Sequence, residues 1–377
     1  MKVTIVVTHL LGTGHLARAM TLARAYAAVG DAVSVVSGGL PAPLLADPDI
    51  TLVQLPPVRS DGVDFSRLLT TQNAPASSEY LAHREVSLLN AFSSFAPDIL
   101  ITELFPFGRR ILRTEFQALL RAAKAAANPP LICASIRDIL APPSKPQKAL
   151  FADDMVRQYY DAVLIHSDPD LMPLELSWPV SAVLRPYLHY TGFVAPPPAG
   201  QHPECAGAGE IIVSAGGGDV GDHIFETAIE MARDVALPVR LLIGGAAPDD
   251  RIAAWRSRAP VTVMIEPARR DFRQMLYHAA ASVSLCGYNT AQDILQAGTP
   301  AVFIPFDEGN EVEQGIRADA LARKSGIETI HRAQLSAQTL LAALTKVIAA
   351  PRRNSPLTVV DGAANTVTKT HNLRGGQ

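Results

Sequence analysis

Short apolar runs alternate with longer stretches of helical periodicity along most of the chain. In the first half these runs predict buried strands, each separated from the next by enough residues for a helix. Continuous apolar strands between helices are typical of a parallel sheet covered on both faces. The predicted strands of this half are Val3–Val7, Ala32–Val36, Thr51–Leu55, Ile99–Thr102, Leu131–Ile136 and Ala162–Ile165.

The alternation stops at residues 195–209, where three consecutive prolines and then small and polar residues predict an interdomain linker. It restarts beyond the linker and continues to about residue 350. The predicted strands of this half are Ile211–Ser214, Val239–Ile243, Val261–Ile265, Ser282–Leu285 and Ala301–Ile304. We therefore expect an α/β protein of two doubly wound, Rossmann-like domains, residues 1–194 and 210–350, which face each other across a cleft.

Two segments fit this pattern less well. Pro56–Ser78 is irregular and polar, so it is either a loop over the cleft or a surface excursion without function. The final residues, 351–377, have weak periodicity. They either pack as a helix, back on the N-terminal domain, or are frayed.

Composition narrows the functional classes. A length of 377 residues, with 48% apolar and 18% charged residues, suits two domains with large cores. A net charge of −3 without a long basic run argues against nucleic-acid binding. The three cysteines have no ligand spacing, which argues against zinc and favours a cytoplasmic setting. The apolar N-terminus is too short for a signal peptide, and we expect no membrane span.

The first candidate site is the loop Gly12-Thr13-Gly14-His15, between the first strand and the first helix. Glycines there let a ligand approach the backbone, and free amides at a helix start attract anions. A neutral imidazole at a helix N-terminus has a lowered pKa, which suits His15 to the role of general base. The alternative is a histidine that only caps or packs.

The second candidate is the glycine run after the strand Ile211–Ser214. Ser214, Gly216 and Gly217 would expose several amides to a diphosphate. The alternative interpretation is a flexible turn.

The third candidate, residues 284–318, is the most informative. Gly287 lies between a strand and a helix that begins near Asn289 and Thr290, and the Thr290 hydroxyl could bind a phosphate. Asp293 lies one turn inside, where a carboxylate could take two ribose hydroxyls. Glu313 and Gln314 follow the next strand and could bind sugar hydroxyls. Taken singly, Asp293 could be a helix-start charge and Glu313 a solvated one.

These three segments together resemble the MurG-like glycosyltransferases of family 28, which have the GT-B fold. The stretches Thr102–Arg110 and Ser135–Asp138 also look typical of a group of bacterial predicted glycosyltransferases. MurG transfers N-acetylglucosamine from UDP to a lipid-linked muramyl peptide. The resemblance therefore implies an inverting hexosyltransferase that takes a nucleotide sugar, with UDP as the implied nucleotide. It implies an acceptor that is a small molecule or a lipid-linked glycan.

The resemblance also implies roles for individual residues. His15 would occupy the position of the family's acceptor-side histidine, and Gly216 and Gly217 would approach the diphosphate. Asp293 would bind ribose, where the family usually has Glu. The pair Glu313-Gln314 stands where MurG has two glutamines that contact the donor sugar, so the sugar need not be N-acetylglucosamine.

Transfer needs a base for the acceptor proton and fixed dipoles for the leaving phosphates. His15 is the first candidate for the base, with Glu103 and Asp138 as alternatives at the ends of predicted strands. Loop amides and Thr290 would replace a metal, so we expect no metal and no cofactor. The two DxD triplets have a central proline and indicate turns. The residues assigned to the acceptor side are Gly12, Thr13, Gly14, Arg109, Arg110 and Arg137.

Two other functions remain open. Residues 12–18 also fit the GxGHxxR pattern of MurG-like nucleotide-sugar hydrolases, which use water as acceptor. A non-catalytic binder or an epimerase of the same fold is the third possibility. The longer N-terminal half favours transfer.

Membrane contact is a separate hypothesis. The segment Leu104–Arg113 combines two phenylalanines with three arginines. Exposed, it could touch anionic lipid or a phosphorylated acceptor, which would place the protein peripherally at the inner membrane. The alternative is a packed loop whose arginines pair inside the domain.

Overall fold

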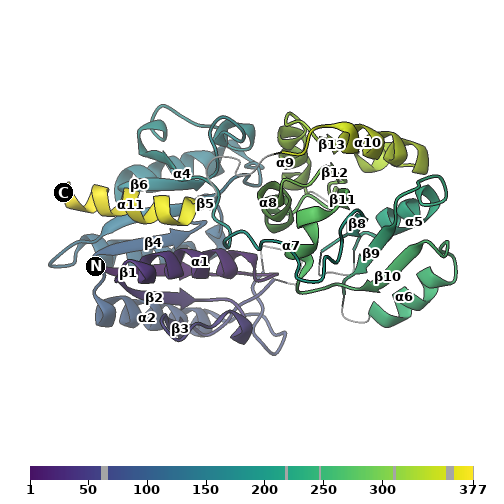
Figure 1. Cartoon of the computed structure of the whole chain (residues 1–377). Coiled ribbons are helices and arrows are strands. Elements are labelled where there is room, and N and C mark those ends of the chain that lie inside the picture. Colours follow the sequence, from purple (N-terminus) through teal and green to yellow (C-terminus); the bar gives the residue numbers. More distant parts are fainter. Residues whose placement is uncertain (61–66, 217–219, 246–247, 309–310, 354–360, 377) are drawn as a thin grey trace. The chain divides into compact units, whose positions relative to one another are not determined.

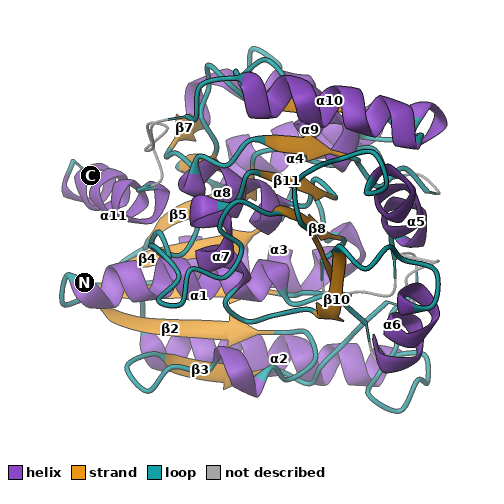
Figure 2. Ribbon diagram, turned by 45° about the vertical axis from the view of Figure 1, so that its right-hand side comes forward, coloured by secondary structure: helices purple, strands orange, loops and turns teal. Residues whose placement is uncertain are grey.

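The computed structural model describes residues 1–60, 67–216, 220–245, 248–308, 311–353 and 361–376. The chain divides into two compact units: Met1–Pro196 together with Asp361–Gln377, and Pro197–Val360. Each unit has a parallel sheet with helices beside it (Figures 1 and 2). The prediction of two parallel α/β domains is therefore confirmed.

The sheet of the first unit has seven parallel strands in the order β3-β2-β1-β4-β5-β6-β7. This order reverses direction between β1 and β4, as in doubly wound folds. The strands are β1 (Lys2–Val7), β2 (Ala32–Ser37), β3 (Thr51–Gln54), β4 (Ile99–Glu103), β5 (Leu131–Arg137), β6 (Ala162–His166) and β7 (Leu188–Tyr190).

Alternate residues of these strands enter two cores, one on each face of the sheet. Val6 packs in a core with Phe116 and Met155, whereas Ile5 packs with Met20 and Val367 on the other side. Because both faces are covered, most residues of the central strands are apolar, which is why these strands could be predicted. The helices of this unit are α1 (Gly14–Ala28), α2 (Ser78–Phe95), α3 (Arg113–Lys124), α4 (Pro146–Tyr159) and α11 (Gly362–Gly375).

Helix α11 is formed by the last residues of the chain and packs on α1 (Figure 1). The hydroxyls of Tyr26 and Thr370 lie 2.7 Å apart, and His371 Nε2 lies 2.7 Å from a carboxylate oxygen of Asp31. Gly362, at the start of α11, lies so close to the backbone of Gly192 and Phe193 that a Cβ would overlap it. The end of the tail is thus a packed helix of the first unit, whereas residues 354–360 lie outside the described residues.

The sheet of the second unit has six parallel strands in the order β10-β9-β8-β11-β12-β13, with its reversal between β8 and β11. The strands are β8 (Ile211–Ser214), β9 (Val239–Ile243), β10 (Val263–Pro267), β11 (Ala281–Ser284), β12 (Ala301–Phe303) and β13 (Ile327–Thr329). The helices are α5 (Asp222–Met231), α6 (Pro248–Arg256), α7 (Phe272–Met275), α8 (Tyr288–Ala297), α9 (Glu313–Leu321) and α10 (Ala337–Ala349).

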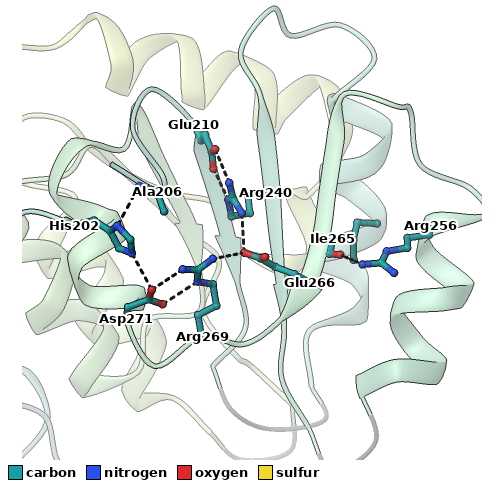
Figure 3. Close-up of polar contacts among 9 residues, drawn as sticks. All are labelled: His202, Ala206, Glu210, Arg240, Arg256, Ile265, Glu266, Arg269 and Asp271. Carbon is teal, nitrogen blue, oxygen red and sulfur yellow. Dashed lines mark hydrogen bonds and ion pairs between the residues drawn. The ribbon is translucent and has the colours of Figure 1, made fainter. Parts of the chain in front are cut away.

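Most of the segment predicted as a linker belongs to the second unit. His202 is buried, accepts backbone N–H bonds of Glu204 and Ala206 at Nδ1, and lies 2.9 Å from Asp271 through Nε2. Figure 3 shows that polar contacts continue from Asp271 through Arg269 to Glu266. The linker prediction was therefore too long, because composition does not show that His202 is buried and paired with Asp271.

The same contacts reach the middle of the sheet. Glu266 accepts a 2.8 Å bond from Arg240, and Arg240 also binds Glu210 through two nitrogens (Figure 3). These neighbours raise the pKa of Arg240 beyond its usual range, with the hydrogen bonds to Glu210 as the largest cause. This network fixes the first residues of the second unit to β8, β9 and β10.

The segment Pro56–Ser78 is only partly irregular, and its residues 61–66 lie outside the described residues. Val58 and Leu68 are buried in the core of the first unit, and Arg59 pairs with Leu69 in an antiparallel bridge. The described part of the segment is thus packed against the domain.

Candidate functional site

The two switch points of the sheets carry the residues that sequence analysis selected. In open α/β sheets ligands bind beyond the carboxyl ends of the strands, where the strand order reverses. In the first unit β1 leads to the loop before His15, and β4 ends at Glu103. In the second unit β8 ends at Ser214 and β11 at Ser284, paired side by side. Each unit thus has its own candidate site.

His15 and Glu103 are in contact in the first site. His15 Nδ1 lies 3.0 Å from Glu103 Oε1, and Arg18 from the same helix also pairs with that oxygen. The side chain of His15 is 17% exposed, whereas that of Glu103 is 1% exposed. The buried Glu103 therefore contacts His15 from inside the domain, and His15 is the member of this pair that a ligand can reach.

The protonation states of the pair follow from burial and charge. Burial alone would raise the pKa of Glu103, but the Arg18 charge and the bonds from His15 and Ser135 hold it well below its usual range. Burial lowers the pKa of His15 to about 3, against the opposing effect of Glu103. Arg18 Nη2 also lies 3.1 Å from His15 Nδ1, but it donates to Glu103 Oε1. An ionised Glu103 can only accept, so it accepts the Nδ1–H of a neutral His15, and the lone pair of His15 lies on Nε2.

Asp138 is not an accessible base. Its side chain is fully buried, and Oδ1 accepts a 2.7 Å bond from the backbone N–H of Ile139. The neighbouring Arg137 is half-buried, and its Nε donates to the carbonyl of Ile139. Of the three candidate bases, His15 alone combines an exposed edge with a carboxylate partner.

The glycines of the first loop are not required by the fold. A Cβ on Gly12 or Gly14 would meet nothing within 4 Å, and neither residue has a left-handed φ. Thr13 precedes α1 without a side-chain cap. The loop therefore has open space beside both α-carbons.

The membrane hypothesis for residues 104–113 is not supported by the described side chains. Phe105 is fully buried and stacks on Phe116, and Phe107 packs edge-on against Trp178. Aromatic rings that fill the core cannot enter a membrane, so the packed-loop interpretation holds for them.

Two of the three arginines of this segment bind backbone carbonyls inside the unit, whereas Arg113 is exposed. Arg109 Nε donates to the carbonyl of Thr8 at 2.6 Å, and Arg110 to that of Phe107. Burial lowers the pKa of Arg109 to about 10, although the nearby Glu103 opposes this shift. Leu104 and Arg109 both have left-handed φ values, of 69° and 56°. Such conformations cost free energy and cluster at functional sites.

The second site is built from glycine-rich turns and a helix start. Gly216 has a left-handed φ of 76° and open space around its α-carbon, while Gly217 lies outside the described residues. Gly287 is the N-cap of α8 and offers no side chain to its first amides. Asn289 and Thr290 occupy the first turn, both at least partly exposed. Uncapped amides of this kind are suited to an anion.

Asp293 lies on α8 and has a partner that sequence analysis missed. Its Oδ1 accepts a 2.7 Å bond from Arg273 Nε of α7, and Arg273 also donates to Gln296 and to the carbonyl of Pro197. Burial raises the pKa of Asp293, while Arg273 opposes the shift. Together with residues 198–200, these side chains line a small pocket.

Glu313 and Gln314 begin α9. Gln314 Oε1 accepts from the backbone N–H of Phe306, which holds the loop before α9. The buried Arg317, one turn further on, donates to the carbonyl of Cys286 at 2.9 Å and lies over the ring of Tyr288. Sequence analysis also missed Arg317, which connects α9 to the turn that contains Gly287.

The described residues contain neither a membrane-spanning helix nor a cluster of side chains that could bind a metal ion. Among the described residues, none of the helices is both long and apolar enough to cross a membrane. Within the same ranges, no three His, Cys, Asp or Glu side chains gather in a way that could hold a metal ion.

Comparison with known proteins shows that most of the second unit is similar to a glycosyltransferase domain. Residues 242–368 match the glycosyltransferase family 28 C-terminal domain. A similar protein from Rhizobium johnstonii, a UDP-N-acetylglucosamine–N-acetylmuramyl-(pentapeptide) pyrophosphoryl-undecaprenol N-acetylglucosamine transferase, is 30% identical over 37% of this chain and 39% of its own length. The protein of that name from Agrobacterium fabrum is 26% identical over 41% and 42%. The chain thus matches about two fifths of the length of these relatives.

Similarity in structure extends further. MurG from Acinetobacter baumannii superposes with a TM-score of 0.63 over 98% of this chain and all of its own, at 16% identity. The calicheamicin glycosyltransferase CalG4 superposes with a TM-score of 0.59 over 99% and 94%, also at 16% identity. The chain therefore has the GT-B fold of these glycosyltransferases, and residues 242–368, most of them in the second unit, match the glycosyltransferase family 28 C-terminal domain.

Proposed function

We propose that the protein is a metal-independent glycosyltransferase that moves a hexose or N-acetylhexosamine from a nucleotide sugar to a hydroxyl acceptor. The observation that carries this proposal is the His15–Glu103 pair at the switch point of the first unit. The family 28 domain in the second unit supports a nucleotide-sugar donor. The names of the relatives support UDP as the nucleotide and a lipid-linked acceptor.

In the proposed reaction His15 Nε2 takes the proton of the acceptor hydroxyl. The acceptor oxygen forms a bond to the anomeric carbon while the bond from that carbon to the diphosphate oxygen breaks. Attack opposite the leaving group inverts the anomeric centre. Glu103 stabilises the imidazolium that forms, because it stays ionised and buried beside Nδ1–H.

In the proposed reaction the second unit binds the nucleotide-sugar donor. The amides that follow Gly216 and Gly287 would stabilise the charge on the leaving diphosphate without a metal. Asp293 would accept the ribose hydroxyls, and Glu313 and Gln314 would bind the sugar. Glu313 accepts hydrogen bonds only, so it would select hydroxyl groups that donate.

The test begins with thermal shifts in UDP, GDP, TDP and their sugars. We expect a clear shift from UDP and from one or more UDP-sugars. Turnover of that donor is then measured with and without hydroxyl acceptors. Release of UDP at the same rate without an acceptor would indicate that the protein is a hydrolase and not a transferase. Hydrolysis is the alternative that residues 12–18 allow. No shift from any nucleotide would contradict both.

A peripheral location at the inner membrane remains a proposal that rests on the lipid-linked acceptors of the relatives. A flotation assay with anionic liposomes tests it. Because the aromatic side chains of residues 104–113 are buried, we expect their replacement by other apolar residues to leave flotation unchanged.

A further inference from the structure

The hydrogen bonds of Glu103 continue into the first unit, away from His15. Ser135 Oγ lies 2.6 Å from Glu103 Oε2 and 2.9 Å from His166 Nε2. His166 Nδ1 lies 2.8 Å from Thr191 Oγ1. The polar groups stand at the carboxyl ends of β4, β5 and β6 and just after β7, and each is at most 2% exposed. Four neighbouring strands of one sheet thus contribute one continuous buried network.

The donor and the acceptor of each hydrogen bond in the network follow from the protons that each group carries. Ionised Glu103 can only accept, so Ser135 donates its single hydroxyl proton to it. The proton between Ser135 and His166 must then come from His166 Nε2. Neutral His166 therefore has its lone pair on Nδ1. Thr191 Oγ1 lies 2.8 Å from this nitrogen, closer than to the carbonyls of Gly192 at 3.0 Å and Ile165 at 3.3 Å, and donates its proton to it. Every bond of the network points toward Glu103.

His166 is held in its neutral form. It is completely buried, and burial lowers its pKa to about 3, helped by the charge of Arg18. A neutral imidazole in a buried site needs one donor and one acceptor, and Ser135 and Thr191 meet both needs. The side chain thus has one tautomer that satisfies its surroundings.

The far end of the network is also fixed. The carbonyl of Thr191 accepts a 3.0 Å bond from Asn365 of α11, and its backbone N–H donates to Ile165. Helix α11 therefore holds the residue that orients His166. The network connects the last helix of the chain to the first candidate site within one unit.

We propose that Ser135 and His166 are positioning residues for the base. They hold the Glu103 carboxylate in the orientation and ionised state that keep the proton of His15 on Nδ1 and the lone pair on Nε2. The catalytic part of this inference rests on the proposed function, whereas the tautomer of His15 does not.

A simpler account treats these groups as buried polar residues that only satisfy one another. Another serine at a strand end of the same sheet shows that a buried hydroxyl there does not always need hydrogen-bond partners. Ser37, at the end of β2, is 1% exposed, and its hydroxyl has no hydrogen-bond partner among the described residues. A buried serine at a strand end of this sheet is thus tolerated without a network, so Ser37→Ala is a matched control for Ser135→Ala.

The first measurement uses the unliganded protein. Selective ¹⁵N labelling of histidine and NMR of the imidazole nitrogens report which nitrogen of His15 is protonated. We expect Nδ1–H for His15 and Nε2–H for His166 in the native protein. Ser135→Ala should give a mixed population of His15 tautomers, and Ser37→Ala should leave the spectrum unchanged. This readout does not depend on a donor or an acceptor.

The second measurement is kinetic. Ser135→Ala should lower kcat roughly 10- to 100-fold, with the donor KM within about twofold, as for partners that orient a reacting group. The kcat of His166→Leu should fall by the same factor. His166→Gln should recover most of the rate, because its amide nitrogen can donate to Ser135 as Nε2–H does. If His166→Leu does not fold, Thr191→Val serves in its place, since it removes the donor to Nδ1.

Two outcomes would overturn the proposal. One is a native His15 protonated on Nε2. The other is a Ser135→Ala variant with the His15 tautomer and the kcat of the native protein. If no nucleotide sugar is turned over, the proposed function fails, yet the NMR result still decides whether the network sets the tautomer.

Discussion

Arg84 and Glu115 form a fully enclosed ion pair in the first unit. Arg84 Nε lies 2.7 Å from Glu115 Oε2, and a second nitrogen lies 3.1 Å from Oε1. The remaining donors of the guanidinium reach the carbonyls of Gly38 and Pro56 and the hydroxyl of Thr8. Arg84 thus ties together the ends of β1, β2 and β3, beside the loop that leads to His15.

Breaking this pair should be costly. Arg84→Met leaves the Glu115 carboxylate buried without its partner, so we expect a loss of about 3–5 kcal/mol in the free energy of unfolding. The double variant Arg84→Met/Glu115→Leu should recover much of that loss. Arg24→Met, which breaks an exposed pair with Asp47, should cost at most about 1 kcal/mol. Equal losses for Arg24→Met and Arg84→Met would contradict this account.

The start of α11 offers a test of close packing. Gly362→Ala would place a Cβ against the carbonyl oxygens of Gly192 and Phe193, so we expect a loss of about 1–3 kcal/mol. Gly375→Ala in the same helix meets no neighbour and should be neutral or stabilising by up to about 1 kcal/mol. Denaturation is followed by fluorescence in a Trp255→Phe background, where the buried Trp178 reports on the first unit alone. A Gly362→Ala variant as stable as the parent would show that α11 can shift.

His15→Ala tests the base. Removal of a general base lowers kcat by roughly 10²- to 10⁴-fold, and nucleotide binding by the second unit should persist. We expect the UDP thermal shift to stay within 1–2 °C, roughly the change that a ΔΔG below 1 kcal/mol produces. The control is His83→Ala, which changes an exposed histidine on α2. A His15→Ala enzyme with native kcat would remove His15 from the mechanism.

Stability should depend on pH through His15 and His166. Burial lowers the pKa of His15 and of His166 from 6.5 to about 3. Between pH 6.5 and 3 the unfolded chain therefore binds protons that the native protein does not. Stability is full above pH 6.5 and falls on acidification, by at most about 1.4 kcal/mol per pH unit for each histidine.

His166→Gln isolates one of these contributions. Between pH 6.5 and 5 the variant should lose about 2 kcal/mol less stability than the native protein, because glutamine takes up no proton. The measurement is the urea midpoint of Trp178 fluorescence at both pH values. An equal loss in both proteins would mean that native His166 is protonated near its ordinary pKa.

Asp293→Asn tests the donor site. If Asp293 binds the ribose, loss of its charge should weaken UDP binding by roughly 10- to 100-fold, the range for hydrogen bonds to a charged group. Asp319→Asn, which changes an exposed carboxylate on α9 of the same unit, should leave the Kd within about twofold. Titration calorimetry with UDP measures both. An unchanged Kd in Asp293→Asn would mean that the carboxylate serves only Arg273.

The strands were largely predictable because both faces of each sheet are covered. Runs such as Val3–Val7 and Ile211–Ser214 contain one polar residue each among apolar ones, and such runs indicated the strands directly. The strands Leu188–Tyr190 and Ile327–Thr329 were missed because each has three residues at an end of its sheet and is partly exposed. Val261 was assigned to a strand that begins two residues later, at Val263.

The positions of candidate site residues were predictable where a glycine or a strand end marked them, as at His15, Glu103 and Gly287. Ser135 and His166 were missed because single polar residues in an apolar strand look like tolerated exceptions. Their signal is position, since His166 ends β6, and only β5, which contains Ser135, lies between β6 and the strand that ends at Glu103. Arg273 and Arg317 could not be found in this way, because an arginine on a helix is usually solvated and only tertiary contacts distinguish these two.

The position of α11 has a consequence for biosynthesis. The first unit is completed by residues 361–377, which leave the ribosome after the whole second unit has been made. At roughly 5–20 residues per second, the gap between Pro196 and the last helix is on the order of 10–40 s. During that interval the apolar surface of α1 beneath α11 is uncovered, and Thr191 lacks its bond from Asn365. The half of the protein that is translated first is therefore the half that finishes folding last, and a nascent chain halted before residue 361 should carry an incompletely assembled base site.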